Sequence, residues 1–116
     1  MKLLTNRTGS YLTGDELADA VMRYGLALAR RRELDVVDIP FITNDGAVRR
    51  VELTIGWSAT TTATSGAERG QELTESDTAR LMNEKADRMA SLRAYPFSPE
   101  ELDRLDGQHH VAVDWI

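Results

Sequence analysis

Residues 35–58 read DVVDIPFITNDGAVRRVELTIGWS, and this stretch decides the fold that we predict for the chain. Apolar residues alternate with polar ones on both sides of residues 44–46, Asn-Asp-Gly, which are typical of a tight turn. The pattern predicts an antiparallel hairpin with strands over 35–43 and 48–58. Its apolar face carries Val37, Ile39, Phe41, Val51, Leu53, Ile55 and Trp57. That face needs a covering layer.

Pro40 lies inside the first strand of this hairpin. Proline has no backbone N–H group, so it cannot donate a hydrogen bond to a neighbouring strand. We therefore expect that this strand is an edge of the sheet, or that the amide side of Pro40 is open.

A helix is predicted over residues 14–32, directly before the hairpin. Thr13 and Glu16 have the spacing of a capping box, in which the threonine hydroxyl accepts from the backbone amide of the glutamate. Apolar residues then recur at helical spacing on one face: Leu17, Val21, Tyr24 and Leu28. This helix can cover the apolar face of the hairpin.

Residues 58–72 are small and polar, with many serines, threonines and glycines. We expect either a flexible loop or, over residues 59–64, a polar extension of the second strand. A second helix is predicted over 75–93. Its apolar stripe is narrow and consists of Leu81, Met82, Met89 and Leu92. A narrow stripe indicates a helix that is partly buried or that packs on a partner.

Toward the C-terminus, Ser98 and Pro99 begin a short predicted helix that ends near Asp106, and residues 109–116 alternate like a strand. Together these elements predict a single small α+β domain over residues 1–116. It would have two layers, with an antiparallel sheet of three to four strands and two main helices on one face, in the order α-β-β-α-α-β. Alternatively, the hairpin completes its sheet in a dimer.

The composition limits the function classes. The chain has 116 residues, a net charge of −5 and no cysteine, which excludes disulfides and a cysteine nucleophile. No apolar run approaches the roughly 20 residues of a membrane span, and we expect a cytoplasmic protein without a membrane partner. The acidic balance argues against nucleic-acid binding, for which residues 30–32, Arg-Arg-Arg, are the main candidate.

The sequence contains no recognisable set of catalytic residues, and we predict no cofactor and no metal. His109 and His110 are neighbours on a predicted strand and therefore point to opposite faces. His110 and Asp114 share a face, but a metal needs three or four ligands. Trp57, His110 and Asp114 are instead the candidate residues for a small-ligand site beside the Ser/Thr-rich loop.

Three functions follow, in order of preference. The first is a non-catalytic module that acts through protein contacts, with itself as a homodimer or with another protein. The alternative is a small-ligand-binding protein or enzyme that uses the site named above. The third is a nucleic-acid accessory protein. No motif identifies a family.

Overall fold

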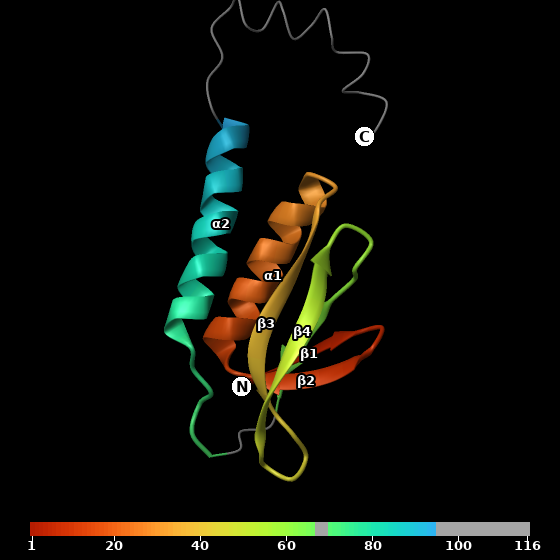
Figure 1. Cartoon of the computed structure of the whole chain (residues 1–116), viewed down its shortest axis with the longest axis vertical. Coiled ribbons are helices and arrows are strands. Elements are labelled where there is room, and N and C mark those ends of the chain that lie inside the picture. Colours follow the sequence, from red (N-terminus) through yellow and green to blue (C-terminus); the bar gives the residue numbers. More distant parts are fainter. Residues whose placement is uncertain (67–69, 95–116) are drawn as a thin grey trace, which may run out of the picture.

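Five strands and two helices make up the described part of the chain, residues 1–66 and 70–94 of a computed structural model (Figure 1). The helices and strands follow one another as β1 (Lys2–Asn6), β2 (Gly9–Thr13), α1 (Asp15–Arg30), β3 (Leu34–Ile42), β4 (Val48–Gly56), β5 (Thr62–Ser65) and α2 (Ser76–Ala94). All strand pairs are antiparallel, in the order β4-β3-β2-β1-β5. The α+β class is confirmed, but the sheet has five strands rather than three to four.

The predicted hairpin is β3 and β4, which pair over nine residues from Leu34 opposite Gly56 to Ile42 opposite Val48. The turn between them closes as predicted. The Thr43 amide donates to Ala47, and the Gly46 amide donates to Thr43, each over 2.9 Å. Gly46 takes the left-handed φ of 85° that this turn requires.

The expectation that the chain begins with a helix is wrong, because β1 and β2 form a hairpin before α1. Asn6 organises its turn: the side-chain oxygen accepts from the amides of Thr8 and Gly9 over 2.8 and 3.2 Å. An asparagine that accepts from the backbone two residues later is a common way to build a turn. The hairpin provides the central strands of the sheet.

The segment after β4 does not extend that strand, as one reading of the sequence proposed. Gly56 and Ser58 adopt left-handed backbone angles, and the chain reverses with Ala59 bridging back to Gly56. Residues 62–65 then form β5, which pairs with β1 at the other side of the sheet. The predicted loop therefore contains a strand.

The core lies between α1 and the sheet. The four predicted apolar residues of α1 are buried, and they join Leu4, Val37, Ile39, Leu53 and Ile55 from three strands. α2 packs along α1 rather than covering the sheet itself (Figure 1). It buries Ala79, Met82 and Ala86, whereas Leu81, expected on the apolar stripe, is 49% exposed. The short helix and the strand predicted after residue 94 lie outside the described residues.

Candidate functional site

One buried contact shows which backbone groups of β3 point toward β4 and which point away from it. The Thr13 hydroxyl donates to the Pro40 carbonyl oxygen over 2.9 Å, from the β2 side of β3. The carbonyl and the nitrogen of a strand residue point to the same side, so Pro40 faces away from β4. Pro40 therefore costs the hairpin no hydrogen bond, in agreement with an open amide side.

The same geometry fixes which groups of β4 face outward. Pro40 is opposite Arg50, so neither exchanges backbone hydrogen bonds with the other, and the backbone groups of Arg50 point away from β3. Because strand geometry repeats every two residues, the same holds for Val48, Glu52 and Thr54. Gly56 fits this pattern, because its carbonyl accepts from the Ala59 amide over 3.2 Å on the outer side.

The outer side of β3 and the outer side of β4 differ in the partners of their backbone groups. Side chains bond to the outer side of β3: the Asp35 carboxylate accepts from the Val36 amide over 2.8 Å, and Arg50 donates to the Asp38 carbonyl over 3.3 Å. On the outer side of β4, the described residues provide no strand and no backbone hydrogen bond apart from Ala59. A cavity of about 240 Å³ lies between residues 52–54 of β4, the β1–β2 turn and residues 58–60. The edge over residues 48–54 therefore has no strand partner within residues 1–66 and 70–94.

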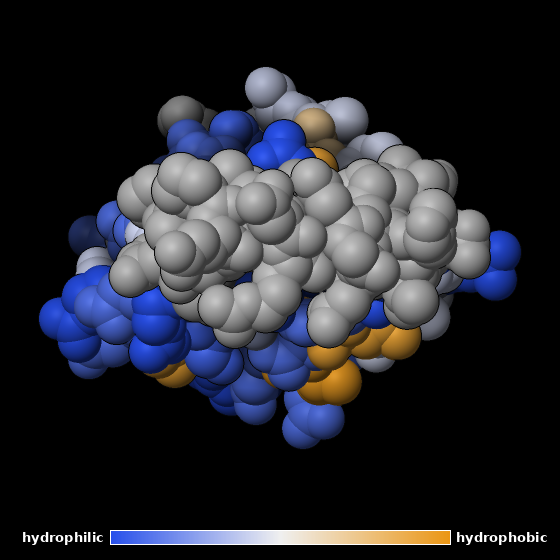
Figure 2. All heavy atoms as spheres, turned by 90° about the horizontal axis from the view of Figure 1, so that it is seen from above, coloured by the Kyte–Doolittle hydropathy of each residue, from blue (hydrophilic) through white to orange (hydrophobic). Residues whose placement is uncertain are grey.

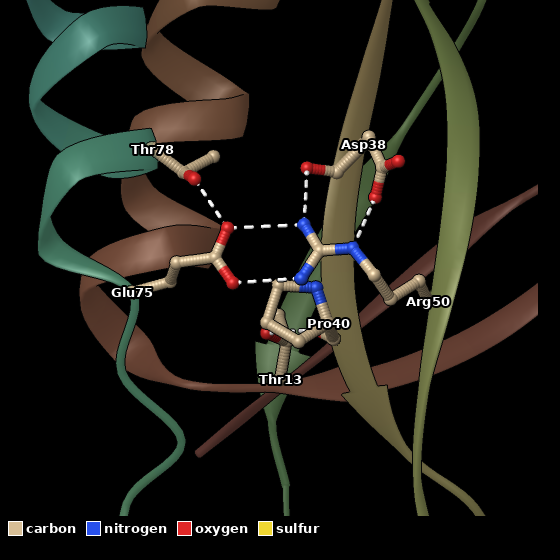
Figure 3. A network of polar contacts seen from close by, with 6 residues as sticks. All are labelled: Thr13, Asp38, Pro40, Arg50, Glu75 and Thr78. Atoms are coloured by element: carbon tan, nitrogen blue, oxygen red, sulfur yellow. Dashed lines mark hydrogen bonds and ion pairs between the residues drawn. The ribbon is translucent and has the colours of Figure 1, made fainter.

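An ion-pair cluster lies across β3 from this edge, between the hairpin and the start of α2 (Figure 3). The Arg50 guanidinium contacts both carboxylate oxygens of Glu75, over 2.8 and 3.0 Å, and the Asp38 carboxylate over 2.7 Å. The Thr78 hydroxyl also donates to Glu75. Arg50, followed by Thr78, lowers the pKa of Glu75 to about 2. The cluster ties the start of α2 to the β3–β4 hairpin.

Glu52 is left out of this cluster. It is exposed and lies directly opposite Asp38 in the strand register, which places two carboxylates side by side. Like charges in opposed positions destabilise a sheet. No cation within residues 1–66 and 70–94 pairs with Glu52, since Arg50 contacts Asp38 and Glu75 instead.

Large apolar side chains are also exposed on the outward face of the hairpin. Val36 is 54% and Val48 is 60% exposed, and Leu34 lies on the same face of β3. Single exposed apolar residues are ordinary, but Val48 lies on the edge strand itself, and Val36 lies on the neighbouring strand. The open edge thus combines free backbone groups, an uncompensated carboxylate and apolar side chains.

Trp57, one of the three predicted ligand-site residues, lies at the far end of β4. Its amide donates to the Glu33 carbonyl over 3.0 Å, and the Arg32 guanidinium lies 5.0 Å from the centre of its rings. The tryptophan borders a cavity of about 350 Å³ between α1 and the turn after β4. His110 and Asp114 lie outside the described residues.

A buried tyrosine forms a polar contact that the sequence did not predict. Tyr24, expected only as core, donates its hydroxyl to the Asp35 carboxylate, and Lys85 of α2 lies 3.8 Å from that carboxylate. Burial, and then this hydrogen bond, raise the pKa of Tyr24, while the pKa of Asp35 is lowered by the same hydrogen bond. The contact joins α1, β3 and α2.

The structure also bears on metal ligands, membrane-spanning helices and the basic run at residues 30–32. Residues 1–66 and 70–94 hold no group of three acidic or histidine side chains placed to bind a metal ion. Neither α1 nor α2 has the length and apolar character that a membrane crossing requires. Of the predicted basic run, Arg31 pairs with Glu33 over 3.5 Å and Arg32 stacks on Trp57.

Comparisons of the chain with protein-family models, with curated proteins and with solved structures found no match.

Proposed function

We propose that the protein is a cytoplasmic, non-catalytic interaction module that pairs with a second copy of itself through the open edge of β4. The single observation that carries this proposal is the contrast between the two sides of the hairpin. Side chains bond to the outer side of β3, whereas the outward backbone groups of residues 48–54 of β4 have no backbone partner in the part of the chain that the structure describes. Pairing two such edges would give each copy a continued sheet.

Charge selects one register for this pairing. When the twofold axis is perpendicular to the sheet, the even-numbered side chains of both copies point to the same face. Two residues can therefore be opposite each other only if both are even-numbered or both are odd-numbered. An axis at Val51 places Arg50 of each copy opposite Glu52 of the other, as a hydrogen-bonded pair. An axis at position 50 or 52 would oppose identical charges. The Val51 register therefore avoids opposing identical charges, while the Arg50 guanidinium stays bound to Asp38 and Glu75 of its own chain.

The apolar side chains support the same register. With the axis at Val51, Val48 of one copy lies opposite Thr54 of the other. Thr54 is already opposite Val36 in its own hairpin, and Val48 is opposite Ile42. The outward face would then carry an apolar row from Val36 to Thr54, and on to Val48 and Ile42 of the second copy. Exposed Val48 would gain Thr54 of the second copy as a directly opposed neighbour.

Glu52→Pro tests the proposal, because the amide of Glu52 points outward. Proline there removes a hydrogen bond of the dimer but none of the β3–β4 ladder. Glu52→Ala is the matched control, since it removes the same carboxylate and keeps the amide. Native mass spectrometry and sedimentation velocity over a range of concentrations should show a dimer for the natural chain.

Glu52→Pro should raise the dimer dissociation constant at least tenfold over that of Glu52→Ala, with unchanged far-ultraviolet circular dichroism for both. A natural chain that is monomeric at every concentration of the series, including the highest, would contradict the proposal. So would equal dimerisation of the two variants.

A further inference from the structure

A second site lies at the other end of β4, and the argument for it does not depend on strand pairing. The cavity beside Trp57 has three walls. The face of α1 around Gly25 forms the first, Ile55 the second, and the turn over residues 57–61 the third. Its volume of about 350 Å³ is at the lower end of the range, about 300–1,000 Å³, that small-molecule pockets occupy.

The chemistry of the walls is apolar. Val21, Met22, Leu26, Ala29, Ile55 and Trp57 line the cavity. The polar side chains among its described lining residues are the hydroxyls of Ser58, Thr60 and Thr61, and none of these lining residues is charged. Such a site favours an uncharged cyclic molecule with at most one hydrogen-bonding group, because a charged group of the ligand would find no side chain of opposite charge among these lining residues.

Gly25 indicates that the space is kept open. A glycine inside a helix costs roughly 0.5–1 kcal/mol relative to alanine. Here a Cβ would lie 3.7 Å from the Cβ of Ile55, an ordinary contact, and the backbone is helical rather than left-handed. Neither packing nor conformation therefore requires glycine at this position, unlike Gly56, where a Cβ would lie 2.4 Å from the Glu33 oxygen. Any side chain at position 25 would begin to fill the cavity.

The opposite wall is held in a defined position. Trp57 is held by the hydrogen bond from its backbone amide to the Glu33 carbonyl and by the Arg32 guanidinium over its rings, although Trp57 remains 45% exposed. Ser58 follows with a left-handed φ of 62°, a conformation that non-glycine residues adopt at a cost. Local strain of this kind is common where a wall must hold a fixed shape.

The exposed apolar surface gathers at the same end of the molecule. Leu26 and Leu34, both more than half exposed, lie on elements that end or begin there, together with Trp57. In the view from above, the coloured atoms that can be seen are mostly hydrophilic, with a few hydrophobic groups among them (Figure 2). Leu26 and Trp57 both line the cavity, so its walls include exposed apolar side chains.

We propose that the cavity between Gly25 and Trp57 is a binding site for a small, uncharged aromatic molecule. The aromatic ring would enter between the α1 face and the indole, where offset or edge contact with Trp57 is favourable. A hydroxyl or carbonyl group on the molecule would meet Thr60 or Thr61.

N-Phenyl-1-naphthylamine, an uncharged fluorescent aromatic molecule, is the probe for the test. The chain has two tryptophans, so Trp115→Phe leaves Trp57 as the single donor for energy transfer to the bound probe. Titration of this full-length variant should give saturable binding of one probe per chain, with quenching of the Trp57 emission. Binding that does not saturate, or that leaves the Trp57 emission unchanged, would overturn the proposal.

Two filling variants locate the probe. Gly25→Leu and Ala29→Leu each add a side chain to the α1 wall, and either should weaken probe binding at least tenfold. Leu81→Ala is the control, because it removes an exposed leucine from α2, outside the cavity. Folding of each variant is checked by circular dichroism, and Ala29→Leu decides the test if Gly25→Leu does not fold. Unchanged binding in a folded filling variant, or equal loss in Leu81→Ala, would overturn the assignment.

Discussion

The hydroxyl of Thr13 and the carbonyl oxygen of Pro40 form a 2.9 Å hydrogen bond between β2 and β3, and the side chain of Thr13 is fully buried. The register between these strands is otherwise limited to Leu12 opposite Ile42. The Thr13 hydroxyl therefore joins the N-terminal hairpin to the long hairpin at a place where the backbone ladder is short.

Thr13→Val should lower the free energy of unfolding by about 1–3 kcal/mol, because the Pro40 carbonyl would be left buried without a donor. Urea denaturation measures the change. Thr64→Val, at an exposed position of β5, is the matched control and should change stability by less than about 0.5 kcal/mol. Equal effects of the two substitutions would show that the Thr13 bond does not stabilise the junction.

Arg50 and Glu75 should be energetically coupled, because the guanidinium meets both carboxylate oxygens. A double-mutant cycle with Arg50→Ala and Glu75→Gln should give a favourable coupling energy, because two parallel contacts fix the geometry of this exposed pair. The exposed pair of Arg80 with Asp77 provides the comparison, and its coupling should be smaller. Additive effects of the Arg50 and Glu75 substitutions would contradict a structural role for the cluster.

The free energy of unfolding should decrease as the pH is lowered, because Glu75 becomes protonated. Its pKa is about 2 in the folded chain against an ordinary value of 4.5, so its contribution is complete above about pH 5. The contribution is lost as the pH falls through the folded pKa toward 2. The stability difference between the natural chain and Glu75→Gln should therefore shrink from pH 5 to pH 2. A difference that stays constant over this range would mean that Glu75 is not the titrating group.

Two glycines with left-handed backbones should respond differently to alanine. At Gly56 a Cβ would lie 2.4 Å from the Glu33 oxygen and 2.9 Å from the Leu28 Cβ, so Gly56→Ala should cost about 3 kcal/mol or more. At Gly46 nothing lies within 4 Å, and Gly46→Ala should cost only about 1–2 kcal/mol of backbone strain. Thermal unfolding of both variants ranks them. A larger cost at Gly46 would contradict the packing of the β4 end on α1.

Local patterns predicted the elements whose signals lie close together in the sequence. The Asn-Asp-Gly turn and the alternation around it specified β3 and β4, and the apolar period specified the buried face of α1. The first hairpin had a readable signal as well, since Asn6 and Gly9 flank a turn between two alternating runs. The end of its second strand coincides with a helix-capping pattern at Thr13, and that pattern predicts only the helix that follows.

Contacts between distant segments were not predictable in this way. Thr13 has the spacing of a helix cap, but its hydroxyl bonds to Pro40, 27 residues away, and Gly14 becomes the cap instead. The return of β5 to β1, and the Arg50–Glu75 pair, likewise depend on where the whole chain places these residues. Of the candidate ligand residues, the structure places Trp57 at a cavity, with partners in α1 that the sequence did not indicate.

Disulfide trapping at Val51 tests the proposed pairing most directly. The chain has no cysteine, so Val51→Cys introduces one thiol, which would face its own copy across the twofold axis. Opposed residues of this kind have Cα atoms about 4.5 Å apart, within the range that a disulfide spans. Arg49→Cys is the control on the same strand face, because its copies would lie about 13 Å apart. Mild oxidation should trap a dimer of Val51→Cys and leave Arg49→Cys monomeric, whereas equal trapping of both, or of neither, would contradict pairing through β4 at Val51.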